Sequence, residues 1–221
     1  MGFLRLLMIV LVFRPLAVIL TGADVCGREH LPRKGPAIVV ANHNSHVDTF
    51  LLLAIFPAGA LKHVRPAAAA DYFLANPLIG WFSRHIIGIV PVERKRVGGD
   101  VDVLAPARAA LAAGDIVVIF PEGTRGDATD RLAPLKSGVA RLAEAFPEAP
   151  VAPVWIEGAG RVLPKGKGLP VPLNCAIHVG PPLRWGGDRK AFMESVRGAL
   201  EQLRAEAPPL HWREGDEPDA A

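Results

Sequence analysis

The fold-determining stretch reads Pro36-Ala37-Ile38-Val39-Val40-Ala41, then Asn42-His43-Asn44-Ser45-His46-Val47-Asp48, and continues as an apolar segment from Thr49 to Phe56. The first six residues predict a buried strand, and the last eight predict a helix. Ser45 and Asp48 have the spacing of a capping box, so the helix should begin at Ser45. His43 then falls in a strand-to-helix turn, the end of the strand at which open α/β sheets place ligands.

Outward from this unit, short apolar runs alternate with helical patterns. Strands are expected at residues 86–92, 115–120, 151–156 and 175–179, and helices at 101–113, 137–146 and 188–205. Gly88 and Pro91 place the first of these strands at an edge or a bulge. The alternation predicts an α/β fold in a single domain, residues 23–206, with a mostly parallel central sheet flanked by helices.

Residues 3–20 form the longest apolar stretch, interrupted by Arg5 and Arg14, and Pro15 should end or kink a helix there. An arginine near the middle disfavours a clean membrane span, and no signal-peptide cleavage pattern follows. We therefore expect residues 1–22 to be a membrane-contacting, interfacial apolar helix whose arginines reach lipid headgroups. A spanning helix and a helix that only packs on the domain remain the alternatives.

Charge is unevenly distributed along the 221 residues. The net charge is +3, but from Glu206 onward five acidic residues face one arginine, so this end carries −4 and the rest +7. Residues 207–221 should form a flexible acidic tail, and the basic body should bind an anion. Nucleic acid is not the expected anion, because aromatics make up only 6% of the chain, with one tyrosine. Cys26 and Cys175 fit neither a metal site nor a disulfide framework.

Two segments carry the chemistry, and the first supplies a base. His43 can accept a proton near neutral pH, and Asp48 can fix its tautomer. On one continuous helix these two side chains would diverge, so they meet only if the helix begins at Ser45. As alternatives, Asp48 only caps the helix, His43 is an ordinary loop residue, or His46 is the base.

The second segment, Phe120-Pro121-Glu122-Gly123-Thr124-Arg125, predicts a turn for an anion. Gly123 lets backbone N–H groups approach a ligand, and Arg125 can grip a phosphate. Glu122 would orient Arg125, bind a substrate hydroxyl or hold the turn. Further cations are Lys136, at an expected helix start, and Arg94, at a strand end. The alternatives are a surface turn with a Glu–Arg ion pair, and a solvated loop at Arg94.

Together these segments resemble the PlsC-like glycerophosphate/lysophospholipid acyltransferase family. Four of its motifs occur in order, and the resemblance covers roughly residues 25–185; the motif positions are His43 with Asp48, Gly88 through Arg94, Phe120 through Arg125, and Val151 through Val154. The resemblance implies fatty acyl transfer from acyl-CoA or acyl carrier protein to a lysophospholipid hydroxyl, foremost 1-acyl-glycerol-3-phosphate.

The resemblance also implies roles for single residues. His43 would be the general base and Asp48 its partner, while the third motif and Arg94 would hold the acceptor phosphate. No cofactor or metal is expected, only the acyl donor as co-substrate. The expected location is the cytoplasmic face of a membrane, peripheral or monotopic, in contact with membrane lipids. Backbone N–H groups near His43 are the suggested oxyanion donors.

Other functions remain open at this point. One alternative is an acceptor with a different headgroup, since Ala67 to Ala70 and Pro91 depart from the family pattern. A non-catalytic membrane lipid-binding protein would keep the scaffold without the chemistry. A hydrolase is disfavoured because the chain has no Gly-x-Ser-x-Gly elbow.

Overall fold

Seven strands form one sheet in the computed structural model, which describes residues 2–69, 76–92, 102–126, 131–163 and 170–207. The strand order is β1-β7-β6-β2-β5-β3-β4. All neighbouring pairs are parallel except β6 and β7. The strands are β1 (Asp24–Cys26), β2 (Ala37–Ala41), β3 (Val64–Ala69), β4 (Val90–Val92), β5 (Ile116–Ile119), β6 (Val151–Glu157) and β7 (Ala176–Val179). The mostly parallel α/β sheet predicted from the sequence is confirmed.

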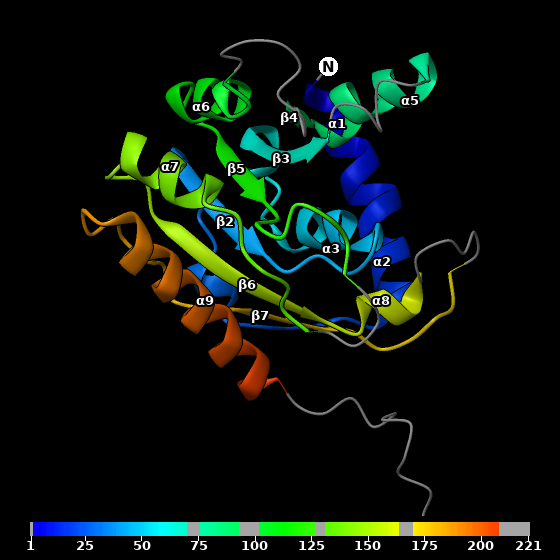
Figure 1. The fold of residues 1–221 in the computed structure, drawn as a ribbon. Coiled ribbons are helices and arrows are strands. Elements are labelled where there is room, and N and C mark those ends of the chain that lie inside the picture. The colour runs from blue at the N-terminus through cyan, green and yellow to red at the C-terminus, as the bar shows by residue number, and fades with distance from the viewer. Residues whose placement is uncertain (1, 70–75, 93–101, 127–130, 164–169, 208–221) are drawn as a thin grey trace, which may run out of the picture.

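Helices cover both faces of this sheet (Figure 1). Alternate side chains of β2 belong to different apolar clusters, one on each face. Val39 packs in one apolar cluster with the N-terminal helices, α3 and α8, while Val40 packs in the other with α6, α7 and α9. The first layer contains α1 (Gly2–Met8), α2 (Arg14–Thr21), α3 (Val47–Ile55) and α8 (Ala159–Val162). The second contains α6 (Ala105–Ala112), α7 (Gly138–Ala145) and α9 (Arg189–Glu206). The burial of β2 on both faces explains why its sequence is apolar at every position.

Most predicted elements are present with ends shifted by a few residues, but the strand expected at 86–92 is wrong in its first half. Residues Ser83–Ile87 are helical, Gly88 has φ +77°, and only Val90–Val92 pair, at the sheet edge. Among the strands and α-helices of the described residues, four were not predicted: β1, β3, α5 (Pro77–Phe82) and α8. β3 is hard to detect because Arg65 and Pro66 interrupt its apolar pattern.

The N-terminal stretch is helical from Gly2 to Thr21, so Pro15 does not end the helix. A π-helical segment, Ile9–Phe13, precedes it, and Pro15 lies in the first turn of α2. Proline lacks an N–H and crowds the preceding turn. The wider winding just before Pro15 is a known way for a helix to accommodate such a disruption.

The expectation that both N-terminal arginines reach lipid headgroups is wrong for Arg5. Arg5 is only 4% exposed, and its guanidinium donates to the carbonyls of Val64, Ile86 and Ile87. Arg14 donates to the carbonyl of Phe56. Both arginines therefore attach the helix to the domain. The helix keeps water away from these carbonyl groups, and the guanidinium groups supply the hydrogen-bond donors that water would otherwise provide.

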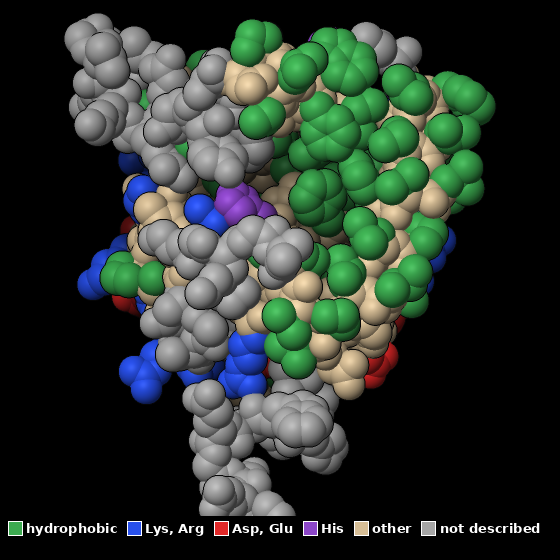
Figure 2. Space-filling view, turned by 90° about the vertical axis from the view of Figure 1, so that its right-hand side faces the viewer, with side chains coloured by type: hydrophobic (Ala, Val, Ile, Leu, Met, Phe, Trp, Pro, Cys, Tyr) green, Lys and Arg blue, Asp and Glu red, His purple; other side chains and the backbone are tan. Residues whose placement is uncertain are grey.

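The N-terminal helix consequently has one face on the domain and one outside. The buried side chains recur every four residues and are Arg5, Ile9, Phe13, Ala17 and Thr21. The outer face is apolar and exposed, and α5 adds further exposed apolar side chains beside α1 (Figures 1 and 2). We call this set the apolar face; its members are Phe3, Leu4, Leu7, Leu11, Val12, Leu16, Val18, Ile19, Leu78, Ile79 and Trp81. By length and mean hydropathy of 2.4, Gly2–Thr21 is long and apolar enough to cross a membrane.

Candidate active site

The turn between β2 and α3 is organised by one buried carboxylate. Asp48 is 1% exposed, and its Oδ2 accepts hydrogen bonds from the backbone N–H groups of Asn44 (2.7 Å) and Ser45 (2.8 Å). The Ser45 bond is the reciprocal half of the predicted capping box, although regular helix begins at Val47. Asp48 therefore does cap the helix, as one alternative held, but capping is not its only contact.

The same Oδ2 lies 2.9 Å from Nδ1 of His43, so the predicted meeting of these two side chains is confirmed. A carboxylate can only accept, so Nδ1 carries the proton and Nε2 keeps its lone pair. The imidazole is stacked on Phe120, with ring centroids 4.1 Å apart, and its side chain is 19% exposed. Asp48 thus fixes one edge of the ring and Phe120 covers one face. The remaining nitrogen, Nε2, can act as a base.

Two residues that the sequence did not assign to the site hold this turn. The Asn42 side chain donates to the carbonyl of Ile156 (2.8 Å) and accepts from its N–H (2.7 Å), continuing the β2–β6 pairing beyond the strand end. Ser45 donates through Oγ to the carbonyl of Leu163. All three bonds reach residues more than a hundred positions away, so local sequence patterns gave no sign of them.

Glu122 joins the second predicted segment to the first. Its Oε1 accepts from the backbone N–H of His43 (2.9 Å), and its Oε2 accepts from that of Ala133 (3.1 Å). The residue is 4% exposed. Of the three roles considered for Glu122, the geometry matches holding the turn, and the surface Glu–Arg ion pair is not formed in the described part of the chain.

The rest of the second segment packs on the His43 turn and presents cations. The Gly126 N–H donates to the carbonyl of His43 (2.7 Å). Gly123 has φ +72°, and a side chain there would collide with Lys136, which lies across it. Arg125 is half-buried, while Thr124 and Lys136 are exposed. Lys136 precedes α7, as predicted.

The electrostatics of the site reflect burial close to these cations. Burial lowers the pKa of His46, and the nearby Arg125 and His43 lower it further. Arg125 therefore lies close enough to the histidine turn to act on its charge. Burial also raises the pKa of Glu122, although the His43 and Ala133 N–H groups oppose this shift.

Backbone N–H groups near His43 cannot serve as oxyanion donors at residues 43 to 45, because Glu122 and Asp48 already accept from all three. Arg94 lies outside the described residues, as does the tail from residue 208. In the described residues, no group of three or more His, Cys, Asp or Glu side chains could hold a metal ion.

One hollow of the molecular surface lies at the border between two kinds of surface. In Figure 2 a histidine side chain lies in a hollow, with Lys or Arg side chains on one side and the apolar face on the other. Such a border suits a substrate with an anionic end and a hydrocarbon end.

Comparison with known proteins identifies relatives of this chain. The model of the family described as Acyltransferase matches residues 22–157. The chain is 33% identical over 144 residues to 1-acyl-sn-glycerol-3-phosphate acyltransferase BAT2, chloroplastic, of Brassica napus, which covers 65% of this chain and 39% of that protein. It is 29% identical over 185 residues to 1-acyl-sn-glycerol-3-phosphate acyltransferase alpha of Mus musculus, covering 80% of this chain and 61% of that protein. The chain therefore spans less than two thirds of the length of these two relatives.

A solved structure has the same fold. The crystal structure of PlsC, the 1-acyl-sn-glycerophosphate (LPA) acyltransferase of Thermotoga maritima, aligns with a TM-score of 0.71 at 25% identity. The alignment covers 92% of this chain and 81% of that one.

Proposed function

Because the chain belongs to the Acyltransferase family, we propose that it transfers a fatty acyl group from a thioester donor to the hydroxyl of a lysophospholipid, with 1-acyl-glycerol-3-phosphate as the acceptor. The donor is acyl-CoA or acyl carrier protein, and the product with this acceptor is phosphatidic acid. The printed names of the relatives from Brassica napus and Mus musculus support this choice of acceptor.

The observation that carries the proposal is the bond between His43 Nδ1 and Asp48 Oδ2. It leaves Nε2 to take the proton of the acceptor hydroxyl as the oxygen attacks the thioester carbonyl. Asp48 stabilises the imidazolium that forms, following the logic of a catalytic triad. The carbon–sulfur bond then breaks, and the imidazolium returns its proton to the leaving thiolate. No protein nucleophile is required, because a thiolate is already a good leaving group.

The acceptor phosphate is assigned to the cations around the second turn. Arg125 acts on the electrostatics of the histidine turn, and Lys136 lies across Gly123. Thr124 is exposed at the same turn and can donate its hydroxyl. Arg94 is assigned to the same phosphate from its motif. A phosphate held here would bring the acceptor hydroxyl toward His43 and supply much of the rate through positioning.

The protein is assigned to the cytoplasmic face of a membrane as a peripheral or monotopic protein. The support is the apolar face beside the site, because an amphipathic surface of this kind lies in the plane of a lipid interface. Both substrates carry acyl chains, so a site that opens at this border can take them without full extraction into water.

A product assay tests the proposal. Purified protein is given lysophosphatidic acid, other lysolipids and each of the two donor types, and the products are separated by mass spectrometry. We expect phosphatidic acid to accumulate. Free fatty acid without diacyl lipid would indicate a hydrolase, and bound but unchanged lysolipid would indicate a lipid-binding protein without activity.

A further inference from the structure

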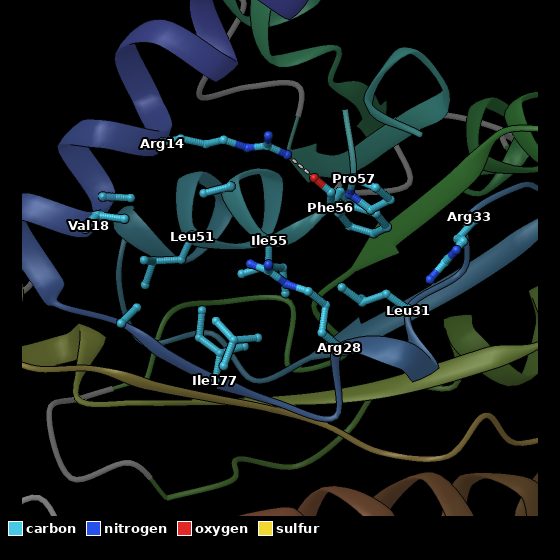
Figure 3. A pocket seen from close by; sticks show the side chains of 14 residues that line it. Arg14, Val18, Arg28, Leu31, Arg33, Leu51, Ile55, Phe56, Pro57 and Ile177 are labelled. Carbon is cyan, nitrogen blue, oxygen red and sulfur yellow. Dashed lines mark hydrogen bonds between the residues drawn. The ribbon is translucent and has the colours of Figure 1, made fainter. Parts of the chain in front are cut away.

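A cavity lies at the far end of α3 from His43, between α2, α3, β1 and β7 (Figure 3). Its volume is about 360 Å³, within the roughly 300–1,000 Å³ of small-molecule sites. None of the residues assigned to acyl transfer lines it. Phe56, at this end, is eight residues beyond Asp48, which is about 12 Å along a helix axis.

Three arginines line this cavity, and no carboxylate does. Arg14 crosses from α2 to the carbonyl of Phe56, and its Nε is buried without a hydrogen-bond partner. Arg28 and Arg33 are exposed, and within the described part of the chain neither guanidinium has an ion pair or side-chain hydrogen bond. Burial lowers the pKa of Arg14, and repulsion from Arg28 lowers it further. Three positive charges thus lie close together here without a neutralising carboxylate in the cavity lining. An anionic ligand would reduce the electrostatic repulsion among them.

The remaining lining is apolar and continuous with the outside of the N-terminal helix. Leu51, Ala54 and Ile55 of α3 form one wall, and Ile177 of β7 forms another. Val18 lines the cavity and is also 64% exposed as part of the apolar face. Hydrocarbon can therefore pass from a lipid layer against the apolar face into the cavity without crossing water.

We infer that this cavity binds one anionic phospholipid, with its phosphate between Arg14, Arg28 and Arg33 and one acyl chain against Leu51, Ala54 and Ile177. Guanidinium groups suit phosphate because they donate two parallel hydrogen bonds. The site is distinct from the proposed acceptor site at Arg125, and its existence does not depend on the acyl-transfer reaction. Its expected role is to seat the N-terminal helix on an anionic leaflet.

The test counts bound lipids directly. Full-length protein in neutral detergent is titrated with phosphatidylglycerol, phosphatidic acid or phosphatidylcholine and examined by native mass spectrometry. We expect one anionic lipid to be retained in preference to phosphatidylcholine. Equal retention of the two anionic lipids identifies a general membrane lipid as the ligand, and preference for phosphatidic acid identifies the phosphomonoester lipid class. Retention of phosphatidylcholine at equal strength overturns the inference.

Matched variants separate a built site from diffuse charge. Arg28→Gln with Arg33→Gln should weaken retention by at least tenfold, at about fivefold for each arginine removed. Lys34→Gln with Lys62→Gln removes the same charge from exposed residues that do not line the cavity, and should leave retention unchanged. Equal loss in both double variants would mean that no site exists.

A third variant addresses the hydrocarbon part while keeping every charge. Ala54→Phe projects a ring into the cavity and should abolish retention, with the melting temperature recorded to confirm folding. If a folded Ala54→Phe protein retains the lipid as the wild type does, the acyl chain does not occupy this cavity and the inference fails.

Discussion

The backbone N–H of His43 donates a 2.9 Å hydrogen bond to Oε1 of Glu122, a residue 79 positions away. His43 is thereby held by two carboxylates, Glu122 at its backbone and Asp48 at its ring. Because both carboxylates are almost fully buried, neither can exchange its partner for water at low cost. The position of the base thus depends on the second turn as well as on its own.

Removing the base is the first prediction. His43→Ala should lower kcat by about 10²–10⁴-fold, the usual contribution of a positioned general base, with little change in the melting temperature. Turnover with acyl-CoA and lysophosphatidic acid gives the measurement, and His30→Ala is the control histidine. Near wild-type turnover in His43→Ala would end the assignment and direct attention to His46.

Asp48→Asn tests the partner of the base. The amide can place its NH₂ toward Nδ1 and so favour the wrong tautomer of His43, which should lower kcat by orders of magnitude while substrate KM changes little. Asp48→Ala should in addition destabilise the protein by about 1–3 kcal/mol, because buried N–H groups lose their acceptor. Equal kcat losses with no difference in stability would contradict the dual role.

Glu122 should leave a pH signature in stability. Burial raises its native pKa above the ordinary 4.5, so the native state binds this proton more tightly than the unfolded chain. Its contribution is therefore greatest below pH 4.5 and is lost as the pH rises through the raised native value. The stability advantage of wild type over Glu122→Gln should shrink across this window, measured by thermal unfolding, with Glu148→Gln as the exposed control. A growing advantage would contradict the predicted shift.

Arg125→Ala should weaken acceptor binding more than it slows chemistry. A charge-assisted hydrogen bond contributes about 1.5–3 kcal/mol, so KM for lysophosphatidic acid should rise roughly 10–150-fold. Monoacylglycerol, which lacks the phosphate, should show no such change. Arg84→Ala, at an exposed arginine of the Ser83–Ile87 helix, serves as the control, and an unchanged KM for the phosphorylated acceptor would remove Arg125 from the phosphate site.

The apolar face should bind lipid membranes. Leu11→Glu with Ile19→Glu alters side chains that are 63% and 74% exposed, so the fold should persist. Each loses about 1.5–3 kcal/mol of burial in lipid, so vesicle binding should fall by more than tenfold. Ser195→Glu with Gln202→Glu adds the same charge on the exposed side of α9 and should have no such effect in a sedimentation assay. Equal binding by both double variants would show that this face is not the membrane contact.

Much of the site was readable in the sequence because its signals are local. The buried run at residues 37–41 gave β2, and the Ser45–Asp48 spacing gave the break that lets His43 meet Asp48. The motif around Glu122 predicted a turn in which Arg125 binds an anion. The strand β3 was not predicted from the sequence, because Arg65 and Pro66 interrupt its apolar pattern.

The sequence by itself determined the alternation of strands and helices and the residues of the two turns, because strand period, capping and turn chemistry act over a few residues. Only the tertiary structure decided what contacts act across the fold. It placed Glu122 on the backbone of His43 and turned Arg5 and Arg14 inward, where buried carbonyls needed donors. The direction in which the arginines of an apolar helix point depends on the surface against which the helix packs. That surface is built from residues elsewhere in the chain.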